Sequence, residues 1–271
     1  MTDRLQKLVA RPGEGGPPLL MCAVVAGDPH VEATVEYLST LADAGADMLE
    51  LIVPFSDPTY HGAVIQRACE RALREEVTWN HVRQIGEGFR QRNDDTALLA
   101  SSYYNRILSL GHEPFADLLS EAGFDGTMVT DLPWNEATPL REALHKRDLS
   151  FVPFVAPTTP RDRLEMMDAE SDSFFVWTGH AGGEVTLSRR DFEASMAEFR
   201  SVSDRPILSS MKISSGEEAA EVVEVTDGVL VGSAIVWLVE GRGADVGDRL
   251  GALAGELREH LDAPPKDQTS T

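Results

Sequence analysis

Long hydrophobic runs, cysteines and lysines are all scarce in this chain of 271 residues. No uninterrupted apolar run approaches the roughly 20 residues that a membrane span needs, and the N-terminus lacks the apolar block of a signal peptide. The two cysteines, Cys22 and Cys69, have no metal-ligand spacing, so we expect reduced packing residues. These absences predict a soluble, cytoplasmic protein without a membrane span or a disulfide framework.

Positive charge is scarce as well. The chain has 24 basic residues against 45 acidic ones, and its only lysines are Lys7, Lys146, Lys212 and Lys266. Nucleic acids and anionic membranes are bound by basic surfaces, so we expect neither as a partner. The acidic residues are spread along the chain, which is typical of proteins from salt-loving organisms, where screening removes the self-repulsion. A surface that recruits cationic partners is the alternative.

Apolar segments alternate with amphipathic ones along the chain. We predict strands at 19–25, 48–53, 97–100, 124–130, 151–155, 174–178, 206–208 and 228–231. We predict helices at 31–44, 62–73, 78–89, 115–122, 136–146, 161–169, 190–200, 216–225 and from 234 onward. Eight strands that alternate with helices predict a single-domain (β/α)8 (TIM) barrel over residues 1–261, including an N-terminal extension.

Two further expectations concern the fold. The tail 262–271 is rich in proline and polar residues, and we expect it to be disordered. A doubly wound open sheet would show the same alternation of strands and helices. However, neither a Gly-x-Gly-x-x-Gly turn nor a Gly-Lys-Ser/Thr loop follows the first strand, so a nucleotide-binding sheet is disfavoured.

Glu50 is the one carboxylate in the apolar segment 48–53. Such a segment is typical of a strand buried on both faces of a parallel sheet. An ionised carboxylate there must be paired, have a raised pKa, or face a site. Pro54 and Pro58 then open a loop before the next predicted helix. A carboxylate late in a buried strand, followed by a loop and a helix, is the arrangement of a catalytic strand in a (β/α)8 barrel.

Residues 50–58, Glu-Leu-Ile-Val-Pro-Phe-Ser-Asp-Pro, resemble the signature Glu-Leu-Gly-Val-Pro-Phe-Ser-Asp-Pro of the tryptophan synthase alpha subunit family. Segments 26–29, 103–105, 131–133, 156–158 and 227–236 also resemble family segments in family order, so the resemblance covers roughly residues 19–240. It implies a lyase that cleaves indole-3-glycerol phosphate to indole and glyceraldehyde 3-phosphate. It implies no cofactor, and a beta subunit as a possible partner.

Functional groups of such barrels lie at the carboxyl ends of the strands and in the loops that follow. The resemblance implies that Glu50 moves protons at the indole carbon and the glycerol hydroxyl, and burial would raise its pKa toward the working pH. A structural carboxylate with a backbone partner is the alternative. Asp131 matches a family aspartate expected to orient the loop after the second strand, but a capping role fits equally well. Tyr103 and Asn105 fit a pocket wall and a partner surface.

His61 departs from the family pattern. The family has an aspartate here, which accepts a hydrogen bond from the indole N–H and stabilises positive charge on the ring. A neutral imidazole can accept that hydrogen bond but brings no negative charge. We expect the loss to cost on the order of 3 kcal/mol, roughly a hundredfold in rate. A solvent-exposed loop histidine is the alternative interpretation of this residue.

The predicted phosphate end departs further. The family holds phosphate with the backbone of a Gly-Phe-Gly-Ile-Ser loop after strand seven and of a Gly-Ser pair after strand eight. Here the first loop is Ser210-Met-Lys-Ile-Ser214, without either glycine, whereas Gly232 and Ser233 remain. Lys212 can supply a point charge for the lost donors, although a lysine is usually exposed at the surface.

The loop after the sixth predicted strand carries two more substrate-binding candidates, His180 and Glu184. Glu184 stands where the family has a catalytic-support threonine, and an acid beside a phosphate is repulsive, which favours an altered ligand. Glu50, His61 and His180 have ligand chemistry but no metal-site spacing, so we expect no metal ion.

Three functions remain open at this point. The first is the family reaction, slowed or adapted by His61 and the altered phosphate loop. The second is a related lyase or aldolase that keeps Glu50 but takes another phosphorylated or otherwise anionic small molecule. The third is a catalytically silent barrel that binds a ligand or regulates a partner. Because Tyr60 and Thr59 replace residues that contact the beta subunit in the family, that partnership is open as well.

Overall fold

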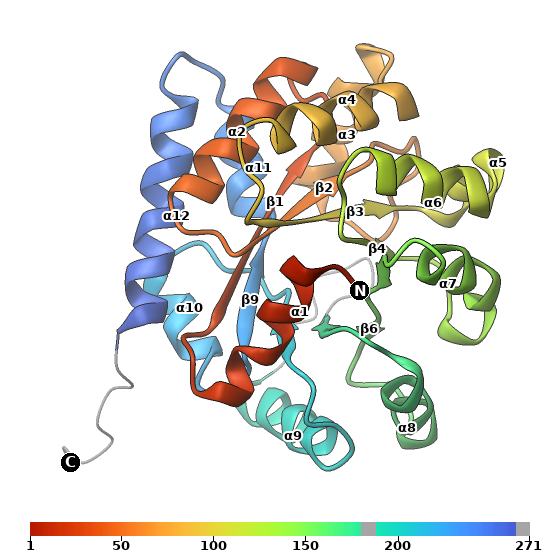
Figure 1. Ribbon diagram of the computed structural model, residues 1–271. Coiled ribbons are helices and arrows are strands. Elements are labelled where there is room, and N and C mark those ends of the chain that lie inside the picture. Colours follow the sequence, from red (N-terminus) through yellow and green to blue (C-terminus); the bar gives the residue numbers. More distant parts are fainter. Residues whose placement is uncertain (180–187, 264–271) are drawn as a thin grey trace.

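The computed structural model describes residues 1–179 and 188–263 (Figure 1). Its parallel strands form one sheet in the order β5-β4-β3-β2-β1-β9-β8-β7-β6. The strands are β1 (Leu19–Val25), β2 (Met48–Ile52), β3 (Ala97–Ser102), β4 (Gly126–Val129), β5 (Ser150–Phe151), β6 (Phe154–Val155), β7 (Phe175–Trp177), β8 (Ile207–Ser209) and β9 (Gly228–Val231). The predicted barrel is thus confirmed, and each predicted strand is found to within about two residues.

The sheet closes through a strand that is interrupted in its middle. β5 pairs with β4, whereas β6 pairs with β7, so the two ends of the sheet are consecutive parts of the predicted fifth strand. Between them, Val152 donates its N–H to Thr127 O at 2.9 Å, and Pro153 O accepts from Val176 N at 3.0 Å. Pro153 has no N–H to give to a ladder, which explains the interruption.

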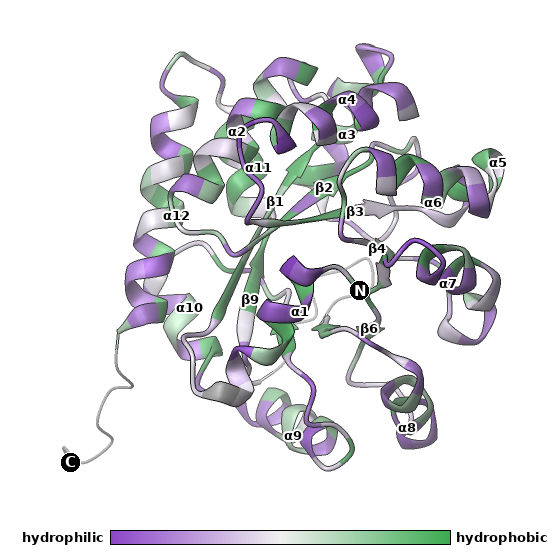
Figure 2. Cartoon of the chain, in the orientation of Figure 1, coloured by the Kyte–Doolittle hydropathy of each residue, from purple (hydrophilic) through white to green (hydrophobic). Residues whose placement is uncertain are grey.

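An outer layer of helices surrounds the strands. In Figure 2 the strands are mostly hydrophobic, and the helices carry both hydrophobic and hydrophilic residues, as expected for helices packed on one side. They are α1 (Asp3–Ala10), α2 (Val31–Asp43), α3 (Ala63–Arg74), α4 (Trp79–Arg90), α5 (Tyr104–Leu110), α6 (His112–Glu121), α7 (Thr138–His145), α8 (Arg161–Glu170), α9 (Arg189–Arg200), α10 (Gly216–Val222), α11 (Ser233–Glu240) and α12 (Val246–Asp262), with 3₁₀ turns at Pro12–Glu14 and Trp134–Glu136.

Every predicted helix is present, but α1 and α5 were not predicted, and the last predicted helix is two helices, α11 and α12. No helix in 1–179 or 188–263 is long and apolar enough to cross a membrane. The tail predicted to be disordered was placed at 262–271, but Asp262 is the last residue of α12, and residues 264–271 lie outside the described part of the chain.

The amino-terminal end of the barrel is covered by α1, which lies across the ring of strands in Figure 1 and buries Leu5 completely. Three aspartates at this end each directly precede a strand and accept a backbone N–H from a neighbouring strand. They are Asp47 (from Leu20, 2.8 Å), Asp125 (from Leu98, 2.8 Å) and Asp227 (from Ile207, 2.7 Å). Each also pairs with an arginine: Arg11, Arg90 and Arg200 respectively. These pairs satisfy N–H groups that would otherwise be orphaned at the strand starts.

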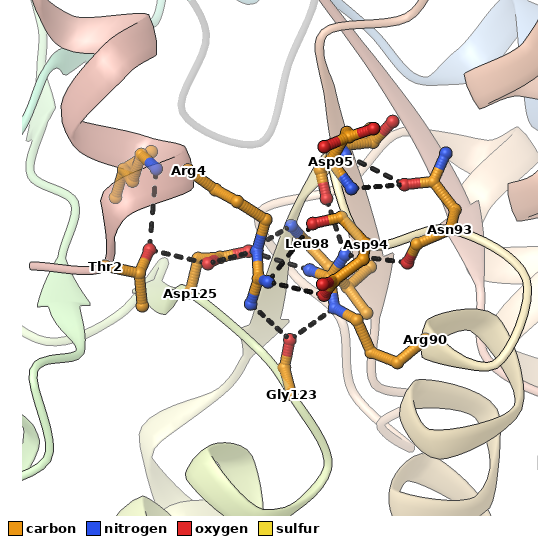
Figure 3. A network of polar contacts seen from close by, with 11 residues as sticks. Thr2, Arg4, Arg90, Asn93, Asp94, Asp95, Leu98, Gly123 and Asp125 are labelled. Carbon is orange, nitrogen blue, oxygen red and sulfur yellow. Dashed lines mark hydrogen bonds and ion pairs between the residues drawn. The ribbon is translucent and has the colours of Figure 1, made fainter.

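Asp125 is the most deeply buried of the three and lies at the centre of the network in Figure 3. Its carboxylate accepts from Arg90 at 2.8 Å, from Arg4 at 3.0 Å and from the Thr2 hydroxyl at 2.6 Å. The network therefore ties α1 and α4 to the start of β4. Glycine must follow Asp125, because a Cβ at Gly126 would lie 2.4 Å from the carbonyl oxygen of Ser150 on β5.

Candidate active site

A cavity of about 500 Å³ opens at the carboxyl ends of the strands. Its wall comes from β1, β2, β6 and β9, from the loop that joins β2 to α3, from the first residues of α3 and α11, and from the residues that follow β4, β7 and β8. This is the end of the barrel where the sequence predicted the functional groups. Glu50, His61, Lys212, Gly232 and Ser233 line the cavity.

Glu50 lies in the middle of β2, in register with Ala23 on β1 and Leu99 on β3. Its side chain is only 4% exposed, and no cation within residues 1–179 or 188–263 forms an ion pair with it. Burial raises the pKa of Glu50 to about 7, and the hydroxyl of Ser101 on β3 opposes that rise. At neutral pH this carboxyl group is therefore divided between its acidic and basic forms, which suits a group that both gives and takes a proton.

His61 lies at the end of the loop between β2 and α3, and it is buried rather than exposed to solvent. Its backbone N–H donates to Pro58 O at 3.0 Å, and its Nδ1 lies 3.0 Å from the Tyr103 hydroxyl oxygen. Burial lowers the pKa of His61 to about 4, so the imidazole is neutral at pH 7. The alternative of a solvent-exposed loop histidine is thus wrong, and a neutral side chain stands at this point of the cavity.

Tyr60 also lines the cavity, which the sequence did not predict. Its ring meets that of His61 edge-on, with centroids 5.3 Å apart, and packs against Phe154 of β6 at 5.5 Å. The hydroxyls of Thr178 and Ser210 lower the pKa of its phenol, but burial raises it more. Tyr60 thus reaches from the loop after β2 toward the ends of β7 and β8. The sequence feature that could have predicted Tyr60 as a cavity residue is its place next to His61, as an aromatic residue in the loop after β2.

Lys212, Gly232 and Ser233 form a positively polarised side of the cavity. Lys212 is exposed, and no carboxylate in the described part of the chain forms an ion pair with it. Gly232 and Ser233 stand at the N-terminus of α11, where backbone N–H groups are free and the helix dipole favours anions. A Cβ at Gly232 would make ordinary van der Waals contacts, the nearest at 3.6 Å from Ala23 and 3.7 Å from Ile65, so nothing crowds this backbone.

The remaining candidates lie elsewhere. Asp131 is outside this cavity: its Oδ1 accepts the N–H of Tyr104 at 2.7 Å, at the start of α5. This contact matches the capping interpretation. Tyr103 lies behind His61 and touches the cavity through it. His180 and Glu184 lie outside the described residues. Within that part of the chain, no group of three or more His, Cys, Asp or Glu side chains is placed to hold a metal ion.

Comparisons with known proteins agree on one family. The family model described as "Tryptophan synthase alpha chain" matches residues 14–261. The chain is 36% identical over 274 residues to the tryptophan synthase alpha chain of Alkalilimnicola ehrlichii, covering 99% of this chain and 100% of that protein. It is 38% identical to that of Geobacillus stearothermophilus, covering 90% and 88%. Among solved structures, tryptophan synthase subunit alpha from Legionella pneumophila matches with a TM-score of 0.89 at 31% identity, covering 97% of this chain and 99% of that one.

Proposed function

The chain belongs to the tryptophan synthase alpha chain family, and on that premise we propose how its own residues carry out the family reaction. The reaction is the cleavage of indole-3-glycerol phosphate to indole and glyceraldehyde 3-phosphate, which makes the chain a lyase of tryptophan biosynthesis. One observation carries the proposal: a buried glutamate with a pKa of about 7 lines a cavity that has a cation on one side and a neutral histidine on another.

Glu50 is the proton carrier. In its acidic form it gives a proton to the indole carbon that bears the glycerol chain, and the ring becomes positively charged. The resulting carboxylate then takes the proton of the neighbouring glycerol hydroxyl. As that oxygen forms the carbonyl group of the aldehyde, the carbon–carbon bond to the ring breaks. The electron pair of the broken bond returns to the ring and neutralises its positive charge. One proton is given and one is taken, so the enzyme ends the cycle unchanged. A pKa near the working pH allows both steps.

The two ends of the substrate meet different walls. The aromatic end lies against the side chains of Tyr60 and Phe154, with His61 as the acceptor for the ring N–H. The phosphate lies between Lys212 and the N-terminus of α11. Lys212 supplies as a point charge what family members obtain from the backbone of two glycines.

Restoring the family carboxylate tests the aromatic end. We expect His61→Asp to raise the rate of indole release up to about a hundredfold, because a negative charge stabilises the cationic ring better than a neutral imidazole. The measurement is indole release from indole-3-glycerol phosphate in high salt, which screens the acidic surface. His61→Asn, which accepts a hydrogen bond without charge, is the matched control. An aspartate variant no faster than the asparagine variant contradicts this role, and no indole from any variant contradicts the reaction.

Removing the cation tests the phosphate end. We expect Lys212→Ala to weaken binding of glycerol 3-phosphate about 10- to 100-fold, the range for losing one charged hydrogen bond. Isothermal titration calorimetry measures this loss. Lys146→Ala is the control, because Lys146 is exposed and pairs with Glu113 at 2.7 Å on the helical layer. Equal affinity of the parent chain and Lys212→Ala would remove Lys212 from the site.

We also propose the family's beta subunit as a partner. The partnership was left open because Tyr60 replaces a residue that contacts the beta subunit in the family. In the structure, however, the side chain of Tyr60 lines the cavity. Of the two replaced residues, Thr59 and Tyr60, only Thr59 is exposed on the loop. Gel filtration of the chain with a beta subunit from the same organism should give one joint peak. Two separate peaks at micromolar concentration would argue against a stable complex.

A further inference from the structure

The hydroxyl of Tyr103 lies between two nitrogen atoms of the loop that follows β2. Its oxygen accepts the backbone N–H of Tyr60 at 3.0 Å, and it lies 3.0 Å from Nδ1 of His61. Tyr103 itself is almost completely buried, and the rings of Tyr103 and His61 are nearly perpendicular, with centroids 5.8 Å apart. One buried phenol therefore fixes both the backbone of this loop and the orientation of the imidazole.

None of the described residues forms a hydrogen bond with the other ring nitrogen of His61, Nε2, and the side chain lines the cavity. A neutral imidazole carries its proton on one nitrogen only, so Nε2 is either a donor or an acceptor, depending on Nδ1. A carboxylate has no such ambiguity, because both of its oxygens accept. Replacing an aspartate by histidine at residue 61 therefore creates a new requirement: the tautomer must be set.

The substrate of the proposed function decides which tautomer is needed. Its ring presents an N–H group. If Nε2 also carried a hydrogen, two hydrogen-bond donors would face each other without an acceptor. Nε2 must accept, and Nδ1 must therefore carry the proton and donate it. Within the described residues the acceptor in reach of Nδ1 is the Tyr103 oxygen. The hydrogen of the Tyr103 hydroxyl is then left for the buried hydroxyl of Thr130, which opposes the rise in the pKa of Tyr103 and has no hydrogen-bond partner among the described residues.

Resting on the proposed function, we propose that Tyr103 is a positioning residue that holds the proton of neutral His61 on Nδ1 and so presents Nε2 to the substrate as a hydrogen-bond acceptor. The site then favours a ring that carries an N–H at this point. An otherwise similar ring with an oxygen in place of that N–H leaves Nε2 unpaired, and the enzyme should discriminate against it.

Nuclear magnetic resonance of ¹⁵N-labelled histidine side chains tests this directly, because the two tautomers give different nitrogen shifts. The probe is indole, added to saturation at pH 7.5, and His61→Gln assigns the signal. We expect Nδ1 protonated and Nε2 unprotonated, both in the free enzyme and with indole. In Tyr103→Phe, which preserves the ring volume, we expect the Nε2-protonated form to become prominent. Protonated Nε2 in the parent chain, or an unchanged tautomer in Tyr103→Phe, overturns the proposal.

Kinetics give a second readout. For Tyr103→Phe we expect kcat to fall about tenfold while KM changes little, because the lost orientation acts on the ring and leaves the phosphate contacts in place. Tyr104→Phe is the matched control: the Tyr104 hydroxyl contacts His112 at 2.9 Å on the outside of the barrel, so removing it should change neither His61 nor kcat. Failure of the proposed function would be seen separately, as a correct His61 tautomer in an enzyme that releases no indole.

Discussion

Glu50→Gln is expected to lower the rate of indole release by about 10²- to 10⁴-fold, the usual contribution of one acid–base group. Glutamine has nearly the same shape as glutamate but cannot exchange a proton, so substrate binding should change little. The measurement is kcat for indole-3-glycerol phosphate at pH 7.5. Glu259→Gln, on the exposed side of α12, is the control for the loss of one negative charge. A Glu50→Gln variant that keeps more than a tenth of the parent kcat would refute Glu50 as the proton carrier.

The same substitution is expected to stabilise the fold. A pKa that burial raises from 4.5 to about 7 means that ionising Glu50 costs the native state about 3 kcal/mol. The native chain holds this proton between about pH 4.5 and pH 7, whereas the unfolded chain has lost it. Stability therefore falls as the pH rises through that window and stays level above it. Urea unfolding should show Glu50→Gln more stable than the parent at pH 8 and nearly equal to it at pH 4.5.

The largest loss of stability is expected for Asp125→Ala. Its carboxylate is fully buried and pairs with Arg90, which has no other carboxylate partner among the described residues, and with Arg4, which would keep only the exposed Asp94 (Figure 3). Breaking such a buried pair costs about 3 to 5 kcal/mol. For a chain of this size the melting temperature should drop by roughly 10 °C.

Asp117→Ala is the matched control for Asp125→Ala. Asp117 also pairs with an arginine, Arg147, at 2.5 Å, but its side chain is half exposed to solvent. Exposed pairs contribute at most about 1 kcal/mol. Thermal unfolding of both variants in the same buffer separates the two cases. Equal shifts in melting temperature would mean that the burial of Asp125 does not matter.

The barrel could be predicted because its strands are buried on both faces, so they stand out in the sequence as short apolar segments between polar loops. Glu50 could be found for the same reason, since it is the one charge within β2. The interruption of the fifth strand was not predicted. Pro153 removes one donor, but where the two halves pair depends on the neighbours β4 and β7, which lie far away in the sequence.

The candidate site was predicted less completely than the fold. Glu50, in the middle of β2, and His61, in the loop after it, line one cavity at the carboxyl end of the barrel, and that end of the barrel follows from the topology. The direction of a loop side chain does not follow from topology. The sequence shows Tyr60 only as a replacement for a residue that contacts the beta subunit in the family, whereas the turn that ends in the hydrogen bond from His61 N to Pro58 O directs its side chain inward.

Asp131 illustrates a second limit. A carboxylate at a strand end can face the cavity or cap a neighbouring helix, and the sequence favoured neither. The partner that it contacts belongs to α5, a helix of seven residues that follows β3 after one residue and has no clear apolar periodicity. Because that helix was not predicted, the sequence offered a capping role for Asp131 without showing which helix it caps.

The hydrogen bond between Asp131 and Tyr104 also links Asp131 to the loop that follows β2. Tyr104 is bonded covalently to Tyr103, and the Tyr103 hydroxyl holds both Tyr60 and His61. The loop after β4 is therefore connected to the segment after β3, and that segment is connected in turn to the loop after β2. A change at Asp131 can shift the imidazole of His61 without touching the wall of the cavity.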